Sequence, residues 1–411
     1  MKDDGEVVSE YYKKNVITVL NSYSKKTMYL FYSIVYKKIV DRYGDEFIDK
    51  VLLNQLLEHG KIYTANIVSG DGSFDGRNGN ILINHYLDKL TTFIFHEIVH
   101  KISWIRSGRK ENKLNSVSNE GGVNIVTNES LKTSDGKMLY FGNYLAMHPN
   151  IVNGTYLTYE LFMSQLNQVV GDEALPKSIL NGNNSFDKKC EKIFGKEKYD
   201  EIISKIRNIH IKNRSYWREY KNQGDRFKAL EKELSEKVED TQNQILTYAF
   251  DALSQDVKSK QEAEEYLSRL VSFANYRIRP LNGKKTEDRF FVEYYKKQKE
   301  ELEERIGTSL KTQYDDTAWD NKYKFVRLDV EEVPKEEYDE IREKGYKEQK
   351  RIMLRRVQSI LGIGNTKITT INGPLYKNES DLERVQGELI KELQDKYKTK
   401  IKSSKKEKED R

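Results

Sequence analysis

Two of the six histidines lie four residues apart in the segment FHEIVHKISW, residues 95–104, and a glutamate directly follows the first. Residues four apart on a helix share one face, so His96 and His100 can both direct a ring nitrogen at one metal ion. Glu97 is rotated by about 100° from His96, which lets it reach a water molecule on the metal without ligating the metal. This His-Glu-x-x-His pattern therefore indicates a hydrolytic zinc site.

The residues around the motif also favour a metal site over a chance match. Chance alone would produce the pattern in about one chain of this composition in a hundred. Apolar residues occupy nearly every face of the helix predicted over roughly 88–106, which indicates that this helix is buried. Buried imidazole and carboxylate groups are costly without partners, and a metal ion would be such a partner.

A third ligand is needed, because catalytic zinc usually takes three protein ligands and one water molecule. The third histidine of the metzincin pattern is absent: Ser103 and Arg106 occupy the positions three and six residues after His100. The remaining candidates for the third ligand are acidic residues further along the chain: Glu111, Glu120 and Glu129.

The segments HEIVH and NEGGVN together resemble the gluzincin metallopeptidases, the thermolysin-like branch of zinc peptidases. The resemblance is specific over roughly 61–130, weaker to about 208, and covers nothing beyond. It implies that Glu120 is the third ligand, on a second helix predicted over about 117–128. Asn124 stands where the family often has aspartate, and it can accept a hydrogen bond from a ligand histidine. Gly121 and Gly122 indicate either a loop or a close approach to the motif helix.

The resemblance implies a zinc-dependent endopeptidase with one Zn²⁺ per chain. Its ligands would be His96, His100 and Glu120, and Glu97 would take a proton from water and deliver it to the leaving amine. Relatives stabilise the oxyanion with a tyrosine or a histidine. Five downstream residues are candidates for that role: Tyr140, Tyr144, His148, Tyr156 and Tyr159. We choose Tyr156, because it opens the helix that follows the Asn-Gly turn at 153–154.

A strand directly before the motif helix is expected to bind substrate. Zincin-type peptidases place an edge strand beside the active-site helix, and GNILINHY, residues 79–86, has that position in the sequence. An exposed edge offers unpaired backbone groups to an extended peptide. The residues expected to pair with substrate are Ile81, Leu82, Ile83 and Asn84. The alternative is an ordinary hairpin strand.

The elements that position these residues indicate an α+β fold that is predominantly helical. Helical spacing predominates over 8–58, and strands are predicted over 61–68 and 81–86, on either side of a glycine-rich turn cluster at 69–80. Further helices are predicted at 154–170, 172–181 and 186–208, and short strands at 322–328 and 367–371. The expected division is an N-terminal helical segment (1–60), a zincin-like peptidase domain with a small sheet (61–208), a charged helical accessory domain (209–395) and a basic disordered tail (396–411).

Composition limits the remaining function classes. Of the 411 residues 33% are charged, and the net charge is only +6, which does not indicate a nucleic-acid partner. The single cysteine, Cys190, excludes an internal disulfide. No signal peptide or apolar run long enough to span a bilayer is visible, so we expect a cytoplasmic protein that acts on protein or peptide substrates. The alternative is a non-catalytic, zinc-stabilised binding protein whose helical C-terminal half docks a protein partner.

Overall fold

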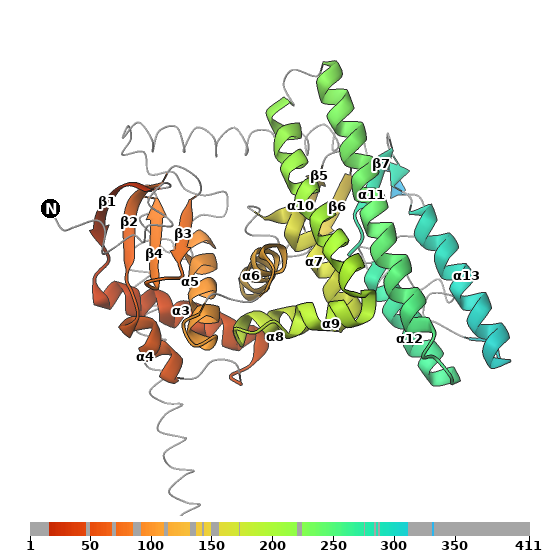
Figure 1. Cartoon of the computed structure of the whole chain (residues 1–411), viewed down its shortest axis with the longest axis horizontal. Coiled ribbons are helices and arrows are strands. Elements are labelled where there is room, and N and C mark those ends of the chain that lie inside the picture. Colours follow the sequence, from red (N-terminus) through yellow and green to blue (C-terminus); the bar gives the residue numbers. More distant parts are fainter. Residues whose placement is uncertain are drawn as a thin grey trace, which may run out of the picture. The chain divides into compact units, whose positions relative to one another are not determined.

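In the computed structural model, the chain up to Glu111 belongs to one compact unit, and a second compact unit begins at Asn112 (Figure 1). The two units are taken in turn. The secondary structure is mostly helical with a small mixed sheet, which confirms the expected α+β class at this coarse level. The structure describes residues 16–46, 50–67, 71–84, 92–110, 114–131, 137–141, 144–148, 156–171, 173–219, 224–274, 276–282, 285–286, 288–310 and 331–332.

The first unit contains a four-stranded sheet in the order β1-β2-β4-β3 (Figure 1). Its strands are β1 (Val16–Ser22), β2 (Ile62–Ile67), β3 (Gly72–Asp75) and β4 (Asn80–Asn84). The central pair, β2 and β4, is parallel, and the two outer strands are antiparallel to their neighbours. All five residues of β4 are buried, so this strand lies in the core of the unit.

Among the residues described in this unit, three helices accompany the sheet: α3 (Lys25–Tyr43), α4 (Lys50–Glu58) and α5 (Thr92–Arg106). The α3 helix begins at a polar cap, where the Ser24 hydroxyl accepts a hydrogen bond from the Thr27 amide at 3.1 Å. The α5 helix, which contains the His-Glu-x-x-His motif, packs against β3, β4, α3 and α4. The α5 helix therefore contacts both the sheet and the other two helices.

Two predictions for this region are wrong. The segment 16–22 was expected to be helical, but it forms β1, because its β-branched residues pair with β2. Within the glycine-rich cluster at 69–80, residues Gly72–Asp75 form the strand β3 before the chain turns into β4. The strands predicted at 61–68 and 81–86 are confirmed as β2 and β4, with their ends shifted by one or two residues.

Eight helices are described in the second unit: α6 (Ser116–Ser130), α7 (Leu157–Val170), α8 (Ala174–Leu180), α9 (Ser185–Phe194), α10 (Lys196–Glu219), α11 (Asp225–Ser254), α12 (Lys260–Ala274) and α13 (Arg289–Ile306). The long helices α10 and α11 run side by side (Figure 1), and α6 packs against α7 and α8. The single helix predicted at 186–208 is two helices, divided at Gly195, whose φ of 78° favours glycine. Because α10 continues to Glu219, it crosses the domain boundary expected after residue 208.

The second unit also contains a five-stranded sheet in the order β5-β6-β7-β8-β9. Its strands are β5 (Lys137–Phe141), β6 (Tyr144–His148), β7 (Arg279–Asn282), β8 (Lys285–Thr286) and β9 (Glu331–Glu332). The strands predicted at 322–328 and 367–371 and the basic tail at 396–411 lie outside the described residues. Among the helices that are described, none combines the length and the apolar character needed to cross a membrane.

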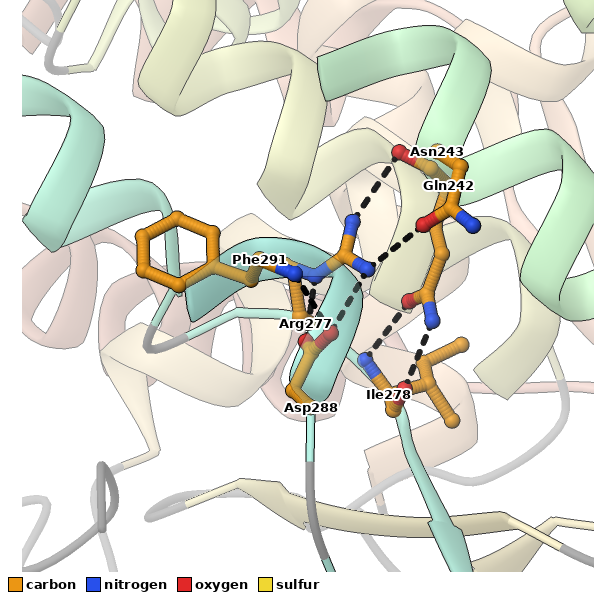
Figure 2. A network of polar contacts seen from close by, with 6 residues as sticks. All are labelled: Gln242, Asn243, Arg277, Ile278, Asp288 and Phe291. Carbon is orange, nitrogen blue, oxygen red and sulfur yellow. Dashed lines mark hydrogen bonds and ion pairs between the residues drawn. The ribbon is translucent and has the colours of Figure 1, made fainter. Parts of the chain in front are cut away.

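A buried ion pair joins three segments of the second unit (Figure 2). The Arg277 guanidinium donates to both carboxylate oxygens of Asp288, which caps the start of α13, and also to the Gln242 carbonyl and the Asn243 side chain on α11. The Gln242 side chain in turn exchanges two hydrogen bonds with the backbone of Ile278. This network fixes the chain between α12 and β7 against α11 and α13.

Candidate metal centre

The two motif histidines direct the same ring atom toward one point. The Nε2 atoms of His96 and His100 lie 3.1 Å apart, and the planes of the two rings are 75° from each other. Two nitrogens that bind one tetrahedral zinc ion at about 2.05 Å each would be about 3.3 Å apart. The measured separation is close to that value, so this pair fits a metal ion that shares both nitrogens.

The helix that holds the histidines is buried on nearly every side. Twelve of the fifteen residues of α5 are buried, including His96 and Glu97, while His100 is half-buried. Lys101 is also fully buried, and its Nζ donates to the Tyr32 hydroxyl at 2.9 Å and to the Gly60 carbonyl at 3.3 Å. Burial lowers the pKa of Lys101 to about 7. These two bonds hold α5 in place one residue after the second motif histidine.

Glu97 lies against the backbone of β3. A Cβ atom built on Gly72 would lie 3.0 Å from Glu97 Cγ and 3.1 Å from Glu97 Oε1. A side chain at position 72 would therefore require Glu97 or Ile83 to shift by a few tenths of an ångström. Sequence reasoning missed this role of Gly72, because the glycine was counted only as part of a turn.

The strand expected to bind substrate is not at the edge of the sheet. Residues Ile81, Leu82, Ile83 and Asn84 belong to β4, which pairs with β2 on one side and with β3 on the other. That prediction is wrong, because a strand with two neighbours has no backbone edge left for a peptide. The outer strand on this side of the sheet is β3, Gly72–Asp75.

Glu120 lies one turn into α6, and the start of this helix is firmly fixed. Asn115 caps the helix by accepting hydrogen bonds from the Val117 and Ser118 amides, both at 3.0 Å. The backbone N–H of Asn115 donates a hydrogen bond at 2.8 Å to one carboxylate oxygen of Asp187 on α9. The other oxygen of this carboxylate accepts a hydrogen bond from the Tyr199 hydroxyl at 2.8 Å. The position of Glu120 therefore depends on a polar network shared by three helices.

The two glycines after Glu120 are helical, which excludes the predicted loop. A Cβ on Gly121 would lie 2.6 Å from Met163 Cγ on α7, and one on Gly122 would lie 2.7 Å from Ile179 Cγ1 on α8. The close approach that the glycines allow is thus to α7 and α8.

The contact described for Asn124 is also within the second unit. Its side-chain amide donates to Glu160 Oε2 on α7 at 3.0 Å, and the amide of Asn128 donates to the same oxygen at 2.7 Å. Glu160 is completely buried, and this burial raises its pKa to about 8. This bond joins α6 to α7, and the hydrogen bond expected between Asn124 and a ligand histidine stays a prediction.

Tyr156 belongs to a cluster of three rings. It directly precedes α7 and stacks on Tyr159, with ring centroids 5.7 Å apart, and on His210 of α10, at 5.9 Å. The Tyr159 and His210 centroids are 4.5 Å apart. Sequence reasoning missed His210, although its spacing from Arg207 and Arg214 marks one face of a helix. Tyr140, Tyr144 and His148 are on β5 and β6.

One group of metal-ligating side chains emerges from the part of the chain that the structure describes: His96, His100 and Glu120. Glu111 lies outside the described residues, and Glu129 is half-buried near the end of α6. Two imidazoles and one carboxylate are the donor types that zinc accepts in catalytic sites. Comparison of the chain with protein-family models, with curated proteins and with solved structures finds no match.

Proposed function

We propose that the protein is a zinc-dependent endopeptidase whose metal ligands are His96, His100 and Glu120. The observation that supports this most is the convergence of the two histidine Nε2 atoms, 3.1 Å apart, on a helix that is otherwise buried. A buried imidazole and a half-buried one directed at the same point are costly unless they share a partner. The resemblance of HEIVH and NEGGVN to gluzincin peptidases supports the same ligand set and one zinc ion per chain.

Glu97 is the proposed proton carrier. A bound zinc ion supplies Lewis-acid chemistry, since it polarises a carbonyl group and acidifies water. Glu97 takes the proton from the attacking water on a carboxylate oxygen and transfers it to the nitrogen of the leaving amine. Its position against Gly72 holds the carboxylate beside β3. The half-buried Tyr156 remains the proposed hydroxyl donor to the oxyanion.

The proposed substrate is an extended peptide that pairs with β3. This strand is the outer one of its sheet and lies beside Glu97, whereas β4 is enclosed. Outer strands offer backbone donors and acceptors at the spacing an added strand needs. Protein or peptide substrates are therefore the class that this arrangement fits.

The ligand set is tested by metal analysis of purified variants. Wild type should hold about one zinc ion per chain, and His100→Ala should remove it. Glu120→Gln should weaken zinc retention strongly, whereas Glu129→Gln, a matched change on the same helix, should not. Full zinc occupancy in His100→Ala, or equal effects at Glu120 and Glu129, would contradict the assignment.

Hydrolysis is tested with an unbiased peptide library and Glu97→Gln. The amide keeps the shape of the side chain but cannot accept the proton, so cleavage should fall by about 10²–10⁴-fold while zinc content is unchanged. If wild type holds zinc but cleaves no peptide, the protein is instead a zinc-stabilised binding protein, and its charged helical half then becomes the partner-docking region to examine.

A further inference from the structure

A positively charged face on α10 lies beside the proposed metal ligand of the second unit. Arg207, His210 and Arg214 follow one another at spacings of three and four residues, which places them on one face of the helix. Both arginines are exposed, while His210 between them is buried under Tyr156 and Tyr159. The ring cluster thus covers the middle of this face and leaves a guanidinium group at each end.

The charges of Arg207, Arg214 and Glu120 all act on the same ring. Burial raises the pKa of Tyr159, and the two arginines lower it while Glu120 raises it. Burial, and then the charge of Arg214, hold the pKa of His210 down at about 4 against the opposing charge of Glu120. Both arginines and Glu120 therefore lie within electrostatic reach of the Tyr159 ring, and Arg207 contacts Ser116, one turn before Glu120 on α6.

Neither arginine forms an ion pair with a residue that the structure describes. The one hydrogen bond that Arg207 makes there is donated from Nη2 to the uncharged Ser116 hydroxyl at 3.0 Å. Two half-buried lysines of the same helix are paired, Lys205 with Asp240 and Lys212 with Glu233. If Glu120 binds zinc, its negative charge is shared with the metal and does not neutralise this face.

We propose that Arg207 and Arg214 bind a carboxylate of the peptide substrate and make the protein selective for acidic peptides. Guanidinium groups present a planar set of donors that match a carboxylate, and such charge-assisted hydrogen bonds are the stronger kind. Tyr156 offers a flat, half-buried surface between them for the adjoining part of the chain. This inference rests on the proposed peptidase function for the identity of its ligand.

The test is peptide binding, measured by fluorescence anisotropy with the full-length, zinc-loaded protein, in which Glu97→Gln is present throughout so that the metal stays bound and the peptides are not cleaved. Four labelled peptides of one sequence are compared: with glutamate or with glutamine side chains, and each with a free or an amidated C-terminus. The first comparison detects a side-chain carboxylate and the second detects a terminal one. The protein with both arginines intact should bind at least one carboxylate form about tenfold more tightly than its neutral counterpart, with an advantage that falls as salt is added.

Arg207→Gln and Arg214→Gln should each remove most of this advantage without changing binding of the neutral peptides. Lys189→Gln, which removes an exposed charge from α9, is the matched control and should keep it. Equal binding of all four peptides by the protein with both arginines intact, or unchanged selectivity in both arginine variants, would overturn the proposal. Because this assay measures binding without cleavage, a wild-type protein that holds zinc but cleaves no peptide would count against the peptidase alone.

Discussion

Replacing Glu160 by glutamine should make the protein more stable at neutral pH. Glu160 is completely buried between α6 and α7, where it accepts hydrogen bonds from Asn124 and Asn128, and burial raises its pKa from 4.5 to about 8. The folded state therefore keeps a proton that the unfolded chain releases near pH 4.5. Glutamine has the shape of the protonated acid and can accept the same two hydrogen bonds.

The magnitude follows from the difference in pKa between the two states. Between about pH 4.5 and pH 8 the folded protein holds one proton more, so its free energy of unfolding falls as the pH rises. At about 1.4 kcal/mol per pH unit, the contribution lost by pH 7 is about 3 kcal/mol. Below pH 4.5 both states are protonated and above pH 8 both are ionised, so the contribution is constant there.

The assay is thermal unfolding of wild type and Glu160→Gln followed by circular dichroism from pH 5 to pH 8. A change of 3 kcal/mol corresponds to about 6–12 °C in a unit of this size, so the Tm advantage of the variant should grow by that amount from pH 5 to pH 7. Glu197→Gln, an exposed change on α10, should show no such growth. A difference between Glu160→Gln and wild type that is the same at pH 5 and pH 8 would refute a neutral Glu160 in the folded protein.

Three further substitutions test the packing around the site. Gly72→Ala should displace the Glu97 carboxylate, so peptide cleavage should fall while the zinc content stays at the wild-type level. Normal cleavage would mean that the contact between Gly72 and Glu97 is unimportant. Gly121→Ala introduces a Cβ where α7 approaches α6 and should cost about 1–3 kcal/mol in urea unfolding. Arg277→Met leaves the Asp288 carboxylate without its ion-pair partner and should lower the free energy of unfolding by about 3–5 kcal/mol. A Tm equal to that of wild type would show that the pair in Figure 2 does not stabilise the fold.

The local features of the candidate site could be predicted from the sequence. A spacing of four residues on a helix determines that His96 and His100 share a face, and the apolar neighbours determine that this face is buried. The same periodicity located α6, which contains Glu120, because helix formation depends mainly on residues within a few positions of each other.

The order of the strands in the sheet could not be predicted from the sequence, because it depends on pairing between distant segments. Whether β4 or β3 lies at the edge of the sheet depends on which strands become neighbours, and the residues within a strand do not contain that information. The strand β1 was mistaken for helix for the same reason, since its partner β2 is about forty residues further along the chain.

Close approaches between helices likewise needed the tertiary structure. The tight contacts of Gly121 and Gly122 with α7 and α8 depend on where those helices dock, as does the meeting of Tyr156 with His210 from α10. The sequence by itself determined which residues share a helix face and could ligate a metal. Only the tertiary structure decided which segments meet there, because contacts between distant segments depend on how whole elements pack.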